Sequence, residues 1–81
     1  MKVRVVLFGR AADQAGVREV ELEVPAGASL RVVVERLAER HPAVAWLGRA
    51  SRPARNQEYA AWDEAAEEGD ELSFIPPVSG G

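Results

Sequence analysis

The stretch Val17–Val24 reads VREVELEV and alternates between apolar and acidic side chains. Val20, Leu22 and Val24 occupy one set of positions, and glutamates occupy the positions between them. A period of two is that of a β-strand with one face buried and one face in water. The stretch therefore predicts a sheet that is covered on one side, and the neighbouring sequence must supply the cover.

The preceding segment, residues 2–9, reads KVRVVLFG and is rich in β-branched residues, which favours a strand. Arg10–Gly16 between the two strands is an Ala-rich connector with room for one helical turn, and Gly16 would end that turn. Two strands joined by a short connection are typical of an antiparallel hairpin.

The following segment predicts the helix that covers the sheet. Pro25-Ala26-Gly27 is a turn signal, and Ser29 is a favourable N-cap. After it, an apolar stripe at helical spacing consists of Leu30, Val33, Val34, Leu37 and Ala38. His41-Pro42 ends the helix, because proline disfavours helical geometry in the residue before it. We interpret His41, the only histidine, as a helix C-terminal residue and assign it no metal or catalytic role.

Two more strands complete the prediction. Arg55–Ala61 is a candidate strand with Tyr59 on one face, and Glu71–Ile75 is the last strand. Trp46, Leu47 and Trp62 are interpreted as packing anchors. The predicted order β-β-α-β-β gives an α+β domain, with about four strands packed on one main helix.

The predicted strands also suggest a docking surface. The helix should cover the sheet face formed by Val3, Val5, Leu7, Val20, Leu22, Leu72 and Phe74. The other face then carries Phe8, Tyr59 and Ile75, which would form an exposed apolar patch for partner binding. The alternative is that the segment from residue 43 to 54 buries these three side chains separately.

Composition excludes several function classes. The 81 residues suffice for one domain, contain no cysteine and carry a net charge of −3. A thiol nucleophile and a zinc–thiolate site are therefore excluded, and the scattered arginines disfavour nucleic-acid binding. We find neither an apolar run of membrane-spanning length nor a signal peptide, and we expect a cytoplasmic protein with no membrane partner. The acidic stretch Asp63–Glu71 is either a solvated loop or a docking surface for a basic partner.

The chain closes with Pro76-Pro77-Val78-Ser79-Gly80-Gly81. We expect a domain over residues 1–75 and a tail over residues 76–81, in which the prolines stop the strand and keep the chain extended. At ~3.3 Å per residue the tail would reach ~20 Å. Glycine lets a tail enter a narrow channel. ATP-dependent adenylation of the Gly81 carboxylate, followed by attack of a sulfur nucleophile, would leave a thiocarboxylate.

Three segments together resemble one known family, the molybdopterin synthase small subunit or MoaD family of ubiquitin-like sulfur carriers. Gly69–Gly81, GDELSFIPPVSGG, is similar to its C-terminal signature, and Asn56-Gln57 to its Asn-Gln pair. The opening VRVVLFGRAAD resembles its first strand and turn. Arg55 departs from the family pattern, which has an apolar residue before the pair.

The resemblance implies a β-grasp, ubiquitin-like fold with parallel first and last strands at the centre of the sheet. It implies that a MoeB-like adenylating enzyme consumes ATP to convert Gly81 to an adenylate and then a 1-thioglycine. The tail residues Pro76, Pro77, Val78, Ser79 and Gly80 would insert into a MoaE-like large subunit. There the sulfur would pass to cyclic pyranopterin monophosphate, and the chain itself would be a non-catalytic subunit with no stably bound cofactor.

Other functions remain open from the residues alone. A carrier of the same chemistry could serve thiamine thiazole synthesis or tRNA thiolation. A ubiquitin-like modifier would be joined to lysines through Gly81, and a plain interaction module would have no terminal chemistry. The sequence does not identify the sulfur donor.

Overall fold

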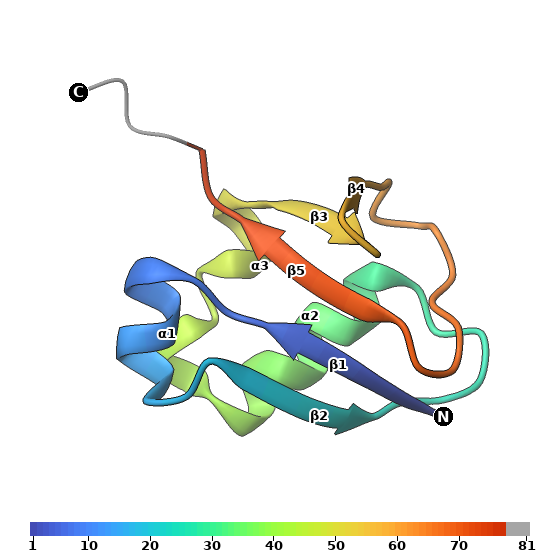
Figure 1. The fold of residues 1–81 in the computed structure, drawn as a ribbon, viewed down its shortest axis with the longest axis horizontal. Helices are drawn as coiled ribbons and strands as arrows, with labels where there is room; N and C mark the ends of the chain where they lie inside the picture. Colours follow the sequence, from blue (N-terminus) through green and yellow to red (C-terminus); the bar gives the residue numbers. More distant parts are fainter. Residues whose placement is uncertain (78–81) are drawn as a thin grey trace.

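The computed structural model describes residues 1–77, and within them five strands form one mixed sheet in the order β2-β1-β5-β3-β4 (Figure 1). At its centre β1 (Lys2–Val6) runs parallel to β5 (Glu71–Ile75), with Val5 opposite Leu72. On the outer side of β1, β2 (Glu19–Glu23) pairs antiparallel and sets Val20 opposite Val5. The predicted hairpin and the parallel central pair are both confirmed.

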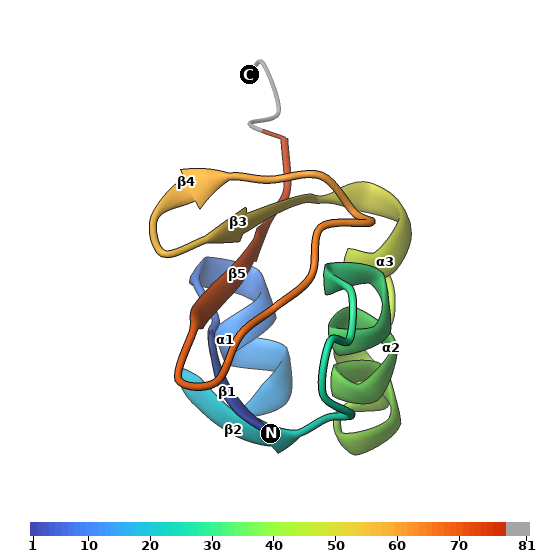
Figure 2. The ribbon, with the colours of Figure 1, turned by 90° about the vertical axis from the view of Figure 1, so that its right-hand side faces the viewer.

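The predicted amphipathic helix is α2 (Leu30–Arg40), which lies across one face of the sheet (Figure 2). The Ser29 side chain accepts a hydrogen bond from the Val32 N–H at 3.3 Å and so caps the first turn. The backbone N–H of His41 donates to the Leu37 carbonyl at 2.8 Å, at the end of the helix. The buried stripe of α2 comprises Leu30, Val33, Val34 and Leu37, and it meets all seven residues predicted for the inner face of the sheet.

Short helices close both ends of this core. The connector after β1 is a two-turn helix, α1 (Gly9–Ala15), longer than the single turn we predicted, and Gly16 ends it at a φ of 76°. The segment after α2 forms η1 (Pro42–Val44) and α3 (Leu47–Ala50). Leu47 is fully buried, as an anchor should be, and the half-buried Trp46 donates from its indole nitrogen to Gln14 Oε1 at 2.7 Å.

The single strand predicted over Arg55–Ala61 is wrong. The chain instead forms a hairpin of β3 (Arg52–Arg55) and β4 (Glu58–Tyr59), which raises the number of strands to five within residues 1–77. Between them Asn56 and Gln57 have φ values of 51° and 71°, the left-handed backbone of a tight hairpin turn. A strand could not continue through two such residues.

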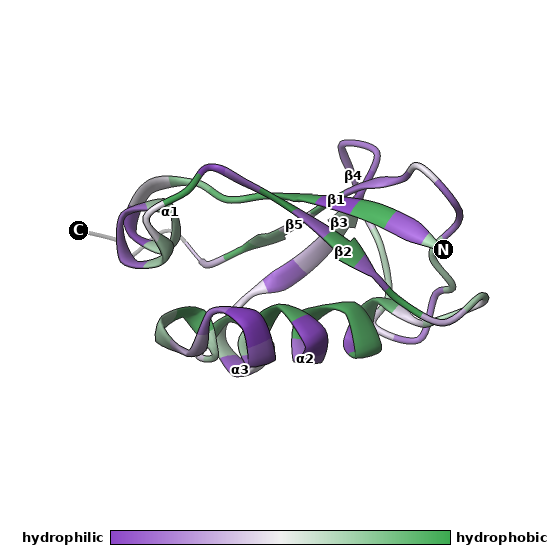
Figure 3. Ribbon diagram, turned by 90° about the horizontal axis from the view of Figure 1, so that it is seen from below, coloured by the Kyte–Doolittle hydropathy of each residue, from purple (hydrophilic) through white to green (hydrophobic). Residues whose placement is uncertain are grey.

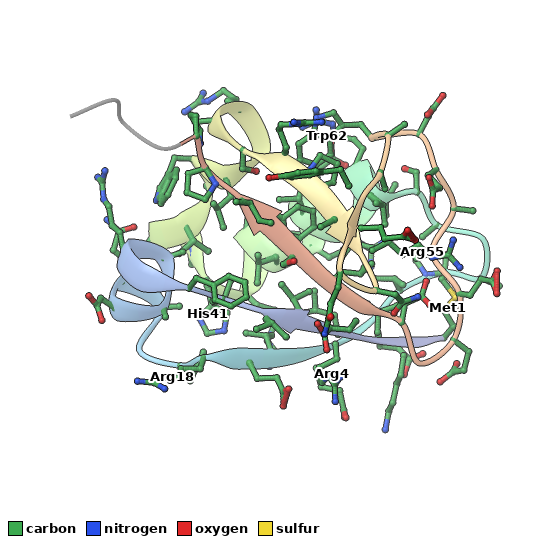
Figure 4. All side chains as sticks on the ribbon, turned by 45° about the horizontal axis from the view of Figure 1, so that its top comes forward. Met1, Arg4, Arg18, His41, Arg55 and Trp62 are labelled. Atoms are coloured by element: carbon green, nitrogen blue, oxygen red, sulfur yellow. The ribbon has the colours of Figure 1, made fainter. Side chains whose placement is uncertain are left out.

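Trp62 follows the hairpin and packs on the rim of the core, as predicted. Trp62 is labelled in Figure 4. Its ring stacks on that of Phe74 with centroids 5.8 Å apart, and the guanidinium of Arg31, which belongs to α2, lies 4.0 Å from the Trp62 ring centroid. These contacts join the segment between β4 and β5 to the helix layer. In the described part of the chain we found neither a helix fit to cross a membrane nor a cluster of metal-binding side chains.

Candidate docking surface

The outer face of the sheet, opposite α2, is divided into two halves of different chemistry. Over β1 and β2 it carries charged side chains arranged in pairs: Lys2 lies 3.7 Å from Glu21, and Arg4 lies 3.3 Å from Glu19. Arg4 also reaches across to Glu71 on β5 at 3.0 Å. Exposed pairs of this kind contribute little to stability, and they keep this half of the face hydrated.

The other half of the outer face, over β5, β3 and β4, is apolar and hollowed. An open hollow of about 500 Å³ is lined by Val6, Phe8, Ala54, Gln57, Tyr59, Glu71, Ser73 and Ile75, and we call it the outer hollow. Phe8 and Tyr59 are 58% and 59% exposed, and Ile75 is half-buried. The structure thus brings the three predicted patch residues together and excludes their burial by the segment from residue 43 to 54.

Each wall of the outer hollow is positioned by local structure. Phe8 is the extended residue before α1, and its carbonyl accepts the N–H groups of Ala11 and Ala12 at 3.1 and 3.3 Å. Tyr59 lies on β4, where the Arg52 guanidinium is 4.0 Å from its ring centroid. Ile75 is the last residue of β5 and pairs with Arg52 in the register.

The predicted tail starts beside this hollow. After Ile75, the exposed Pro76 and Pro77 carry the chain beyond the end of β5 (Figure 1). Val78, Ser79, Gly80 and Gly81, which the sequence assigned to tail insertion and to terminal chemistry, lie outside the described residues. The hollow and the root of the predicted tail therefore adjoin each other.

A group of polar side chains joins the β3–β4 hairpin to the segment between β4 and β5. We call it the Asp70 cluster, and it consists of Arg55, Asn56, Glu64, Glu67 and Asp70. Asp70 is 6% exposed, and its Oδ2 accepts from Arg55 Nε at 2.6 Å and from the Glu67 N–H at 2.7 Å. The outer nitrogens of Arg55 lie 3.1 Å from Glu64 and 3.1 Å from Glu67 (Figure 4). One guanidinium thus bridges three carboxylates of the segment between β4 and β5.

Contacts within the Asp70 cluster shift the pKa values of Asp70 and Arg55. Burial by itself would raise the pKa of Asp70, but hydrogen bonds from the Glu67 backbone, Arg55 and Asn56 outweigh it, so the pKa lies below its usual value. The hydrogen bond to Asp70 is the main reason that the pKa of Arg55 is raised. At neutral pH Asp70 and Arg55 are therefore both charged.

The cluster corrects our interpretation of the acidic stretch. We offered a solvated loop or a surface for a basic partner, yet Asp70 is buried and Glu64 and Glu67 pair with Arg55 within the chain. Arg55, the departure from the family pattern, is the residue that pairs with all three carboxylates and offsets part of their negative charge. A single basic residue facing a run of acids was the signal in the sequence that could have indicated this pairing.

Comparison with known proteins identifies the family. The ThiS family profile matches residues 5–81. The molybdopterin synthase sulfur carrier subunit of Chlamydomonas reinhardtii is 35% identical over 83 residues, covering 100% of both chains.

Solved structures agree with the sequence comparison. The crystal structure of SAMP1, a small archaeal modifier protein from Haloferax volcanii, matches with a TM-score of 0.86 and 34% identity over 100% of both chains. A complex of subunits 1 and 2 of molybdopterin-converting factor from Helicobacter pylori contains a chain that matches with a TM-score of 0.68 and 26% identity, again over 100% of both chains. With a profile match over nearly its whole length and the β-grasp, ubiquitin-like fold of these structures, the chain belongs to the ThiS family.

Proposed function

We propose that the protein is the sulfur carrier of a molybdopterin synthase, with Gly81 as the residue that bears the sulfur. The observation that carries this proposal is the position of the outer hollow beside the root of the predicted tail. A partner that seats an apolar group against Phe8, Tyr59 and Ile75 receives the tail at high effective concentration, because the docked body tethers it. The sequence relatives named as sulfur carrier subunits support the same assignment.

The proposed chemistry has two stages at the Gly81 carboxyl group. First, the carboxylate attacks the α-phosphate of ATP, pyrophosphate leaves, and a mixed anhydride with AMP results. Sulfide then attacks the carbonyl carbon and forms the carbon–sulfur bond as AMP departs, and loss of the sulfur-bound proton leaves a thiocarboxylate. In the second stage this sulfur bonds to a carbon of cyclic pyranopterin monophosphate as a carbon–oxygen bond at that carbon breaks and the oxygen departs. Water then cleaves the carbonyl–sulfur bond, which restores the Gly81 carboxylate and leaves the sulfur on the pterin.

Two partners take part in this proposal in turn. A MoeB-like adenylating enzyme performs the first stage and consumes the ATP. A MoaE-like large subunit receives residues 76–81 for the second stage, and the Helicobacter pylori complex of subunits 1 and 2 supports such an assembly. Because one hollow serves both, the two partners compete for it, and the chain acts as a co-substrate without a catalytic side chain or bound cofactor of its own.

A second candidate function has a specific observation in its favour. The match to SAMP1, a small archaeal modifier protein, has a TM-score of 0.86 and extends over the whole of both chains. A modifier would use the same Gly81 adenylate, but a lysine amine would displace AMP and form an isopeptide bond. The two functions differ in the nucleophile and not in the fold.

Intact-mass spectrometry separates these candidates. The protein is incubated with ATP, its adenylating enzyme and a sulfide source, with and without other cellular proteins. We expect a gain equal to one sulfur-for-oxygen exchange, located on Gly81 by fragmentation. Adducts to lysines would support the modifier. A second carrier protein serves as the positive control for the adenylating enzyme. An unchanged mass of our protein, when the same enzyme does adenylate that control, would overturn the proposal.

A further inference from the structure

The turn between β3 and β4 has a backbone that its sequence does not favour. Both central residues lie in the left-handed region, with φ values of 51° at Asn56 and 71° at Gln57. Asparagine tolerates this region, but the second position of such a turn usually holds glycine, and glutamine is rare there. A backbone of this kind persists only where its surroundings hold it in place.

The side chain of Asn56 is what holds the turn. Its Oδ1 accepts the Glu71 N–H at 3.0 Å, and its Nδ2 donates to Asp70 Oδ1 at 3.0 Å. Its backbone N–H donates to the Glu71 carbonyl at 2.7 Å. One residue therefore ties the turn to the start of β5 through three hydrogen bonds.

The anchor for these bonds is itself fixed. Asp70 is buried and also accepts from Arg55 Nε and from the Glu67 N–H, so its carboxylate is held by two neighbouring residues of the hairpin and by one backbone N–H of the segment before β5. A buried charge with all of these partners in place resists reorientation. Asn56 thus bonds to a rigid group and not to a solvated side chain.

The turn supports one wall of the outer hollow. Gln57 and Tyr59 both line the hollow; Gln57 is the next residue after Asn56, and Tyr59 is three residues after it. β4 has only two residues and pairs with β3 alone among the described strands. A strand this short adds little rigidity of its own, so the placement of Tyr59 depends on the turn that leads into it.

We infer that Asn56, backed by Asp70 and Arg55, is a positioning residue that holds Tyr59 in its docking position before a partner arrives. If the hairpin is already ordered before binding, complex formation does not include the entropy cost of ordering it. Asn56 can therefore raise the affinity without contacting the partner. The inference rests on the proposed function, because it assumes that the outer hollow is the docking surface.

The test uses Asn56→Gly, which keeps the left-handed backbone accessible and removes only the side-chain bonds. The full-length protein is titrated calorimetrically into the molybdopterin synthase large subunit of the same organism. We expect Kd to rise about tenfold, which corresponds to about 1.4 kcal/mol. In a Tyr59→Ala background the same substitution should raise Kd by less than about twofold, since residues that act through one another are not additive.

The matched control is Val34→Ala, which weakens the core away from the hairpin and should leave Kd unchanged. A tenfold effect that persists in the Tyr59→Ala background, or an equal effect of Val34→Ala, would overturn the inference. If Tyr59→Ala alone leaves Kd unchanged, the docking surface in the proposed function is wrong.

A readout without any partner keeps the inference separate from that outcome. Nuclear Overhauser contacts from the Tyr59 ring to the side chains of Arg52 and Ala54 report where the ring lies. We expect Asn56→Gly to weaken these contacts and Val34→Ala to retain them. Unchanged contacts in Asn56→Gly would contradict the positioning role, whatever the partner does.

Discussion

The two faces of the sheet differ in burial: the inner face is covered by α2, and the outer face is exposed. On the inner face Val3, Val5 and Leu72 are at most 1% exposed, and α2 covers them throughout. On the outer face, which no helix of residues 1–77 covers in Figure 3, charged pairs over β1 and β2 adjoin the outer hollow over β5, β3 and β4. An antiparallel or mixed sheet needs only one covered face to fold. The fold therefore depends on the inner face, and the outer face is available for docking.

Within the outer face, the charged half also protects the sheet. β2 is an edge strand, and its glutamates Glu19, Glu21 and Glu23 discourage another strand from pairing with it. The hollowed half has no such row of charges. The two halves thus combine protection against nonspecific pairing with a specific apolar contact.

The largest effect on stability should come from the inner face. Leu37→Ala removes a fully buried side chain of α2 and should lower the free energy of unfolding by ~2–5 kcal/mol. Urea unfolding followed by circular dichroism measures this loss. Arg36→Ala, on the exposed side of the same helix, is the matched control and should change stability by less than ~0.5 kcal/mol. Equal effects of the two would contradict the inner-face account.

The next effect concerns the Asp70 cluster. Asp70→Asn keeps the shape of the side chain but turns an amide donor toward the donors of Arg55 and Glu67, and should cost ~1–3 kcal/mol. Asp63→Asn, an exposed position in the same acidic stretch, is the control and should be nearly neutral. If both variants unfold at the same urea concentration as the wild type, the cluster is not a structural anchor.

The difference in unfolding free energy between the wild type and Asp70→Asn should depend on pH with a defined sign. The pKa of Asp70 is lowered in the folded state, so its contribution to stability is fully present above its unfolded value of about 3.9. The contribution is lost as pH falls through the folded-state pKa. Unfolding free energies of wild type and Asp70→Asn should therefore differ by a constant amount from about pH 6 to pH 8 and converge in strong acid. A difference that grows on acidification would contradict the assignment.

Substitutions in the outer hollow should strongly affect partner binding and, at exposed positions, should affect stability little. Tyr59→Asp and Ile75→Asp place a charge in the hollow and should weaken binding to both partners by at least about tenfold, or ~1.4 kcal/mol. Tyr59→Asp should change the free energy of unfolding little, because this side chain is exposed. Lys2→Ala, on the charged half, is the control for calorimetry. Unchanged affinity of the Tyr59 variant for both partners would remove the hollow from the mechanism.

The smallest effect on stability belongs to the tail. Within residues 1–77 the buried core runs from Val3 to Phe74. Chain ends usually make few contacts, so deletion of Gly80 and Gly81 should barely shift the melting temperature. The same deletion should abolish sulfur transfer. Calorimetric melting of the deleted and complete proteins checks the first part, and a large shift would mean that the tail packs on its own body.

The elements that the sequence predicted well are those with strong periodicity. The alternation in Val17–Val24 and the helical stripe from Leu30 to Ala38 each bury one face, so one pattern indicates both the element and its orientation. The grouping of Phe8, Tyr59 and Ile75 on the outer face followed from the alternation of inner and outer positions along the predicted strands. The pairing of the first and last strands came from the family resemblance, because periodicity contains no information on strand order.

The elements that were missed lack such a signal. β3 reads Arg-Pro-Ala-Arg, with a proline and two arginines in four residues, so neither alternation nor β-propensity marks it. The Asn56-Gln57 turn lacks the glycine that usually signals a tight hairpin, because side-chain bonds to Asp70 and Glu71 hold it instead. Long-range contacts of this kind cannot be deduced from neighbouring residues.

If the Gly81 carboxyl group must end the chain to carry sulfur, then adding one residue after Gly81 should abolish sulfur transfer. The extended protein, the original protein and a Gly81-deleted protein are compared for conversion of cyclic pyranopterin monophosphate by the large subunit, adenylating enzyme, ATP and a sulfur source. We predict full folding by circular dichroism and no sulfur transfer for the extended protein. Full transfer by the extended protein, with mass spectrometry excluding removal of the added residue, would contradict the account.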